Sequence, residues 1–139
     1  MRLDLYQAET ERLAREQSVM LDEARLKLET GQPLSLLEQS GILHALQVLT
    51  ENAIGKAKHM LKAAGEPVPV SAYDAFASLA RRGALPAEEL AKWNNVIGIR
   101  NRIVHDYMNI DMNVVFDLVR EAKYRFVAEF LLRPIGRQA

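Results

Sequence analysis

Hydrophobic positions along the chain recur at intervals of three and four residues, the spacing typical of amphipathic helices. A first helix is expected from about Arg2 to Glu29, because Thr30-Gly31 follows it and glycine favours a helix stop. Ser35 and Glu38 have the spacing of a capping box, so they predict the start of a second helix that continues through Leu61.

The rest of the chain continues in the same way. Gly65-Glu66-Pro67 closes the second helix, and Ser71 with Asp74 predicts a short third helix that ends at Arg81-Arg82-Gly83. A fourth helix follows Pro86 and two acidic residues, and a fifth starts near Asp111 and stops before Pro134. Because short connections join neighbouring helices, the sequence predicts an all-α, up-and-down bundle of about five helices.

Length and composition narrow the class of protein. The 139 residues fit one domain over 1–139, and 49% hydrophobic with 26% charged residues is the balance of a globular protein. The absence of cysteine excludes disulfides and thiolate metal sites, and with no signal-like or membrane-length apolar stretch we expect a cytoplasmic protein. The formal net charge is zero, so any contact with nucleic acid must be local.

One position breaks the pattern of the fourth helix. At about 100° per residue, an apolar stripe is centred on Arg100, with seven hydrophobic residues within roughly 80° of it. These are Leu90, Trp93, Val96, Ile97, Ile103, Val104 and Tyr107. Because burying an unpaired guanidinium costs several kcal/mol, Arg100 should meet an anionic ligand, a subunit boundary or an acid of another helix, for instance Glu51.

Asn101 and His105 lie side by side on one border of the stripe, and His105 is about 140° around the helix from Arg100. A second copy of the helix across a dimer axis could complete the cluster, which predicts a homodimer with a shared polar cleft. Histidine, arginine and asparagine suit phosphodiester chemistry, although a histidine at a helix border is often only structural. His44 and His59 have no ligand partner at metal spacing, so no metal site is expected.

The segment Arg100-Asn101-Arg102-Ile103-Val104-His105-Asp106-Tyr107 resembles the Arg-x4-His-x-Tyr signature of the HEPN superfamily, specifically its HepT-like toxins, and the resemblance covers residues 34–132. It implies an all-helical, homodimeric and metal-independent endoribonuclease without cofactors, the toxin of a HEPN/MNT toxin–antitoxin pair. Arg100 and His105 would be its catalytic pair, Asn101 would hold the phosphate or the imidazole, and Glu51 would support them. Because the 2′-hydroxyl of RNA is the attacking group, a 2′,3′-cyclic phosphate product is expected.

Two residues of the motif have more than one interpretation. Tyr107 is either a packing residue of the stripe or, as the resemblance implies, the acceptor of AMP from a cognate minimal nucleotidyltransferase antitoxin, with which the homodimer could form a larger hetero-oligomer. Arg102 is either a solvent-facing charge or an RNA contact.

Two other functions stay open: a noncatalytic partner subunit of a nucleotidyltransferase, and a structural dimer in which Arg100 forms a salt bridge.

Overall fold

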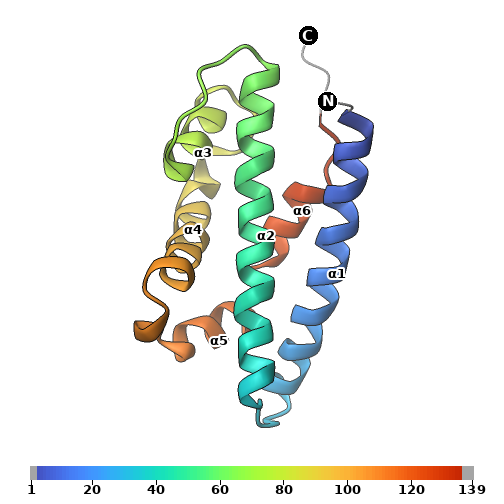
Figure 1. Ribbon diagram of the computed structural model, residues 1–139, viewed down its shortest axis with the longest axis vertical. Helices are drawn as coiled ribbons and strands as arrows, with labels where there is room; N and C mark the ends of the chain where they lie inside the picture. Colours follow the sequence, from blue (N-terminus) through green and yellow to red (C-terminus); the bar gives the residue numbers. More distant parts are fainter. Residues whose placement is uncertain (1–2, 136–139) are drawn as a thin grey trace.

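The computed structural model describes residues 3–135, which form six α-helices and two 3₁₀ turns, with no strand among them (Figure 1). The expected helix start at Arg2 lies outside these residues. The elements are α1 (Leu3–Glu29), α2 (Leu36–Ala63), α3 (Ala72–Arg81), η1 (Ala87–Glu89), α4 (Leu90–His105), η2 (Tyr107–Asn109), α5 (Met112–Arg120) and α6 (Arg125–Leu132). The all-α class predicted from the sequence is confirmed.

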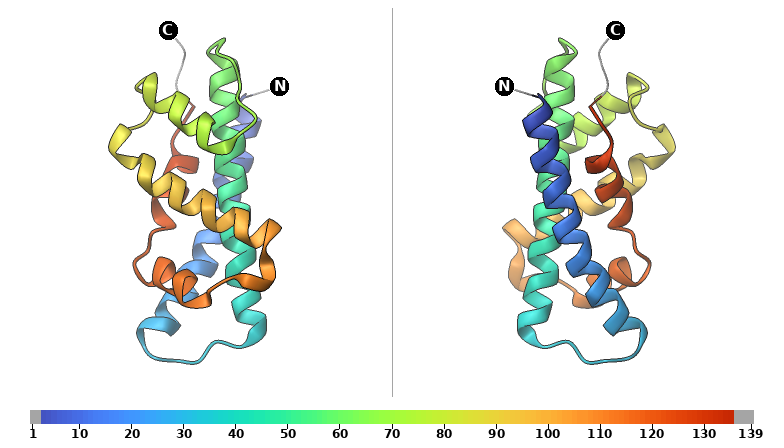
Figure 2. Two further views of the ribbon diagram at one scale, coloured as in Figure 1. Left: turned by 90° about the vertical axis from the view of Figure 1, so that its left-hand side faces the viewer. Right: turned by 90° about the vertical axis from the view of Figure 1, so that its right-hand side faces the viewer.

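The two longest helices form the frame of the molecule. The chain runs along α1, turns at the lower end of Figure 1, and returns along α2 beside it. Helix α2 also contacts α3, α4 and α6, and the side view in Figure 2 shows α4 crossing α2 obliquely. Every helix that carries a candidate site residue therefore packs directly on α2 or belongs to it.

The local signals for helix ends act as predicted. The Ser35 hydroxyl accepts a hydrogen bond from the Glu38 backbone N–H at 3.0 Å, and the Glu38 carboxylate accepts one from the Ser35 N–H at 3.0 Å. Ser71 caps α3 by accepting from the Asp74 N–H at 3.3 Å. Glycines follow α1, α2 and α3 in the left-handed conformation, which only glycine adopts without steric cost, and these are Gly31, Gly65 and Gly83.

The predicted single fifth helix is wrong, because the chain breaks there into α5 and α6. Ala122 adopts a left-handed φ of 54°, its N–H donates to the Val119 carbonyl, and the Lys123 N–H donates to the Leu118 carbonyl. This pairing of bonds ends α5 as a Schellman-type cap does. The turn redirects the chain so that Tyr124 and the apolar side of α6, which includes Val127, pack into the core.

An aromatic cluster fixes the start of α4 in the core. Trp93 is fully buried and stacks on Phe76 of α3 with ring centroids 4.1 Å apart. Phe126 and Phe130 of α6 approach the indole edge-on at 4.8 and 5.1 Å. Because packed aromatic rings contribute several kcal/mol through area and geometry, this cluster holds the start of α4 against α3 and α6.

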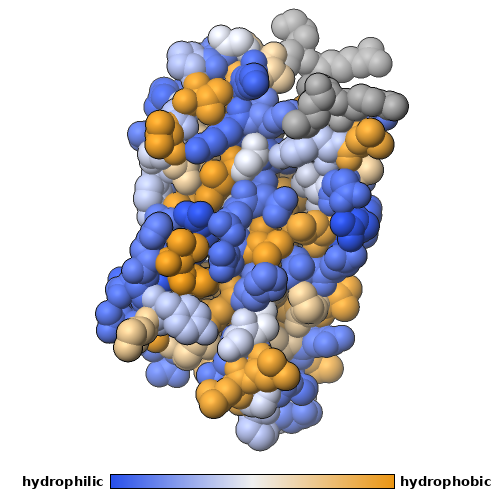
Figure 3. All heavy atoms as spheres, viewed as in Figure 1, coloured by the Kyte–Doolittle hydropathy of each residue, from blue (hydrophilic) through white to orange (hydrophobic). Residues whose placement is uncertain are grey.

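A buried lysine ties α6 to α2. The Lys56 side chain, only 1% exposed, donates from Nζ to the backbone carbonyls of Phe130 at 2.7 Å and Arg133. These carbonyls lie at the C-terminal end of α6, where a cation is favoured by the unpaired acceptors and the helix dipole. On the face of the molecule shown in Figure 3, hydrophilic and hydrophobic residues are interspersed. Within residues 3–135 no helix combines the length and apolarity needed to cross a membrane.

Candidate functional site

Arg100 lies on the inner side of α4, and an acid of another helix pairs with it. Its Nη2 donates to Oε2 of Glu51 on α2 at 2.9 Å, and its Nη1 donates to Oδ1 of Asn101 at 3.0 Å. Of the three kinds of partner expected for Arg100, an acid of another helix is present in the structure, and it is Glu51. Four of the seven hydrophobic residues of the stripe are buried, namely Trp93, Val96, Ile97 and Ile103, and Leu90 is half-buried.

The guanidinium keeps unused capacity for an acceptor. Its Nε is shielded from solvent and donates to no group among the described residues. Nη1 and Nη2 are held by Asn101 and Glu51, and the Arg100 side chain is still 24% exposed. Each Nη has one further N–H, and because the planar guanidinium is fixed at two points, these two donors are held in one orientation toward an anion in the groove, whereas the shielded Nε is out of reach.

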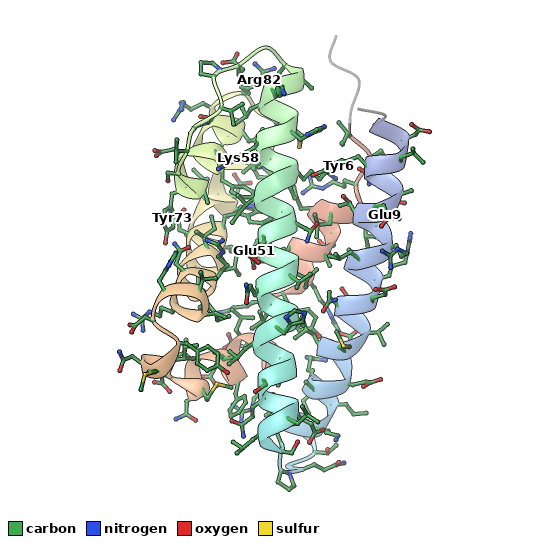
Figure 4. The ribbon with its side chains drawn as sticks, viewed as in Figure 1. Tyr6, Glu9, Glu51, Lys58, Tyr73 and Arg82 are labelled. Carbon is green, nitrogen blue, oxygen red and sulfur yellow. The ribbon has the colours of Figure 1, made fainter. Side chains whose placement is uncertain are left out.

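Arg100 and Asn101 line an open groove of about 590 Å³ between α2, the segment 70–73 and α4. Glu51 and Lys58 come to this groove from α2, and Tyr73 comes from α3 (Figure 4). The Asn101 amide donates from Nδ2 to the Tyr73 hydroxyl at 3.5 Å, a long contact. A chain of contacts therefore runs from Glu51 through Arg100 and Asn101 to Tyr73, across the floor of the groove.

His105 is the last residue of α4, and its side chain is exposed. It is not among the residues that line the groove beside Arg100. The next residue, Asp106, leaves the helix with φ −145°, and its carboxylate accepts from the Asn109 amide at 2.6 Å. Within one chain the structure brings Arg100, Asn101 and Glu51 together and leaves His105 around the helix from them.

Tyr107 lies beyond the end of α4, in the turn η2, and its side chain is 54% exposed. The interpretation of Tyr107 as a packing residue of the apolar stripe is therefore wrong, and Val104, at 39% exposed, does not belong to the buried stripe either. The helical spacing that predicts the stripe does not apply to Tyr107, because α4 ends at His105. The Tyr107 ring is left accessible to another molecule.

Arg102 is exposed on the outer side of α4, as the solvent-facing interpretation requires. It borders a second, smaller cavity between α4 and α5, together with Asn94 and Asn95. Over residues 3–135, no group of three or more histidine or acidic side chains is arranged to hold a metal ion.

Lys58 and Tyr73 were not among the site residues expected from the sequence. A signal for Lys58 was present, because it follows Glu51 by two helical turns and so shares the same face of α2. Tyr73 has no such signal, since its position depends on how α3 packs against α4.

Comparison with known proteins gives a family and a fold. The family described as Ribonuclease HepT-like matches residues 14–133. A solved structure described as "Crystal structure of the toxin-antitoxin with AMP-PNP" superposes with a TM-score of 0.71 at 18% sequence identity, over 94% of this chain and 99% of that one. At this identity the superposition shows a shared fold. No curated protein sequence matches the chain significantly.

Proposed function

This chain belongs to the HepT-like ribonuclease family, and from that premise we propose that it is a metal-independent endoribonuclease and the toxin of a toxin–antitoxin pair. The observation that carries the proposal is the Arg100-x4-His105-x-Tyr107 motif at the end of α4. Its arginine is fixed by Glu51 and Asn101 at the edge of an open groove. Its histidine and tyrosine are exposed.

The proposed reaction uses the substrate's own hydroxyl. The 2′-oxygen of a ribose attacks the adjacent phosphorus, the bond from phosphorus to the 5′-oxygen of the next nucleotide breaks, and a 2′,3′-cyclic phosphate and a 5′-hydroxyl result. A proton leaves the 2′-hydroxyl and another joins the departing oxygen, and His105 exchanges one of these protons near neutral pH. Arg100 stabilises the charge that grows on the phosphoryl oxygens, and Asn101 orients the phosphate or the guanidinium.

We propose that two copies share one cleft, because Arg100 and His105 of a single chain point to different sides of α4. This arrangement makes a specific prediction for mixed dimers. Arg100→Ala and His105→Ala proteins, each inactive alone, should regain activity when unfolded and refolded together, since a mixed dimer contains one cleft with both native groups. If the mixture stays as inactive as its components, the two groups act within one chain or not at all.

Tyr107 is the proposed acceptor of AMP. A nucleotidyltransferase antitoxin would join the Tyr107 oxygen to the α-phosphorus of ATP and release pyrophosphate. The exposure of Tyr107, two residues from His105, supports this role, as does the fold shared with a toxin–antitoxin structure that contains AMP-PNP. Co-production with the cognate antitoxin should add the mass of AMP to the peptide that contains Tyr107, and a Tyr107→Phe protein should stay unmodified.

The direct test compares RNA cleavage by the native protein, Arg100→Ala and His105→Ala, with circular dichroism to verify folding. Native protein should yield cyclic phosphate ends and leave an all-deoxy strand uncut. Both variants should lose activity at least a hundredfold. Equal cleavage by the three proteins would refute the assigned chemistry.

One observation favours a second candidate, a noncatalytic partner subunit of a nucleotidyltransferase. Arg100 is already paired with Glu51, and His105 of the same chain lies outside the groove. Such a subunit would bind its partner equally well with His105→Ala and would show no RNA turnover.

A further inference from the structure

The groove beside Arg100 holds a second cation, Lys58, that pairs with no acid among residues 3–135. Lys58 lines the groove, and its Nζ donates to the Val70 backbone carbonyl at 2.8 Å. No carboxylate within the described part of the chain forms an ion pair with Lys58, whereas Glu51 partly compensates Arg100. Because an ammonium has three donors, two remain for an anion in the groove.

Lys58 lies at a defined separation from the reacting position. Glu51 and Lys58 are two turns apart on one face of α2, which is roughly 10 Å along the helix axis. Since Glu51 holds Arg100 and Lys58 follows Glu51 by two turns, the two cations come to the groove at different levels along α2. A strand whose scissile phosphate binds Arg100 can reach Lys58 with a neighbouring phosphate.

Tyr73 lies between these two levels in Figure 4. Its ring lines the groove, and its side chain is 38% exposed, although large aromatic groups are usually buried. The Tyr73 hydroxyl accepts the long hydrogen bond from Asn101, and part of the ring is accessible from the groove. Aromatic rings next to cations are the chemistry with which proteins hold single-stranded nucleic acids, through stacked bases and bound phosphates.

We propose that Lys58 and Tyr73 form a subsite for the nucleotide next to the cleavage point, with Lys58 binding its flanking phosphate and the Tyr73 ring stacking on its base. The subsite rests on the proposed ribonuclease function. It supplies local charge in a chain whose formal net charge is zero. The groove of about 590 Å³ is of the size that holds a small ligand such as a nucleotide.

The competing explanation is structural: Lys58 only anchors the loop at Val70, and Tyr73 only positions Asn101. A structural role would change affinity for every RNA alike. A subsite changes affinity only for strands long enough to reach it, so substrate length separates the two explanations.

The experiment measures equilibrium binding of two short RNA strands that differ by one flanking nucleotide and its phosphate. Both carry a 2′-deoxy group at the cleavage point, so they bind without being cut. Native protein should bind the longer strand about tenfold more tightly, and Lys58→Gln should reduce that difference and lower the salt dependence by about one phosphate contact. Tyr73→Leu, which removes the ring, should weaken binding of the longer strand more than Tyr73→Phe, which keeps it.

Lys92→Gln is the matched control, since Lys92 is an exposed lysine on α4 that borders a different cavity. It should keep the native preference for the longer strand. The subsite is refuted if Lys58→Gln keeps that preference or if the native protein shows none. If the native protein binds with the expected preference but cuts no all-ribose RNA, the ribonuclease proposal fails, and Lys58 and Tyr73 are left as a binding site for a single-stranded RNA that is not cut.

Discussion

Replacing Arg100 by lysine or alanine should lower RNA cleavage by far more than it lowers stability. In the folded chain the guanidinium makes an ion pair with Glu51 at 2.9 Å and a hydrogen bond to Asn101 at 3.0 Å. The two side chains of the ion pair are 24% and 37% exposed, so solvent screens the pair and can rehydrate Glu51 when its partner is removed. The two contacts together contribute about 1–2 kcal/mol, and a domain stable by about 5–15 kcal/mol stays folded without them.

The effect on catalysis follows from the transition state. Removing a single fixed donor to a developing oxyanion costs about 2.7–4 kcal/mol, or a hundred- to thousandfold in rate. Lysine should not rescue this loss, because one ammonium can pair with Glu51 but cannot span Glu51, Asn101 and a phosphate as the planar fork does. Arg100→Lys is therefore expected to cleave RNA at least a hundredfold more slowly than the native protein while unfolding at nearly the native urea concentration.

The assay pairs a cleavage time course with urea unfolding followed by the fluorescence of Trp93, the only tryptophan and fully buried. Glu51→Gln is the informative control, since it removes the ion pair but keeps Arg100 and an acceptor for it. Its effect on positioning should be at most about 1 kcal/mol, less than tenfold in rate. The reasoning is refuted if Arg100→Lys keeps activity within about threefold of native, or if Glu51→Gln loses as much activity as Arg100→Ala.

Three further predictions concern the frame that carries the site. Ala122→Gly should stabilise the protein by roughly 0.5–1 kcal/mol in urea unfolding, because glycine relieves the left-handed φ of 54° at some entropic cost; a destabilised variant would contradict this. Burial, with a hydrogen bond to Asp22, raises the pKa of Tyr124 to about 12, so the folded state keeps a proton that the unfolded chain releases above pH 10. Stability should be intact below pH 10 and fall as the pH rises toward 12, and Tyr124→Phe, followed by thermal unfolding at each pH, should show a smaller fall. Lys56→Met should destabilise by about 2 kcal/mol, since it leaves carbonyls at the end of α6 without donors, whereas Lys62→Met at an exposed position should be near native.

The sequence predicts correctly those helices whose ends are marked by capping residues or glycines. Ser35 with Glu38 marks the start of α2, and Gly31, Gly65 and Gly83 each occupy a left-handed position just after a helix. The break between α5 and α6 was missed because its left-handed residue is Ala122. Neither glycine nor proline is present between residues 121 and 124, so the local sequence favours a continuous helix and tertiary packing overrides it.

The candidate site, like the fold, could be predicted from the sequence only in part. A charge in an apolar stripe predicts a partner for Arg100, with Glu51 as one example among three kinds of partner, and the ion pair with Glu51 is the one that forms. The helical periodicity assigns Tyr107 to the stripe, because periodicity alone contains no signal that α4 ends at His105. Lys58 shares the face of α2 with Glu51, a pattern that the sequence contains, whereas Tyr73 reaches the groove through the packing of α3, which no pattern within one helix can reveal.

The motif places Arg100 and His105, the two groups that we propose react with RNA, on different sides of one helix, and this division bears on the proposed regulation. His105 follows Arg100 by five residues and therefore lies about 140° around the helix from it. His105 is also the last residue of α4. Arg100, fixed against α2, belongs to the groove, while His105 and Tyr107 belong to the exposed end of α4. A cleft completed by a second copy would join the arginine side of one chain to the histidine side of the other. AMP on Tyr107 would then place its charge and bulk on the histidine side of every cleft, where it repels the RNA phosphate without disturbing the Glu51–Arg100 pair.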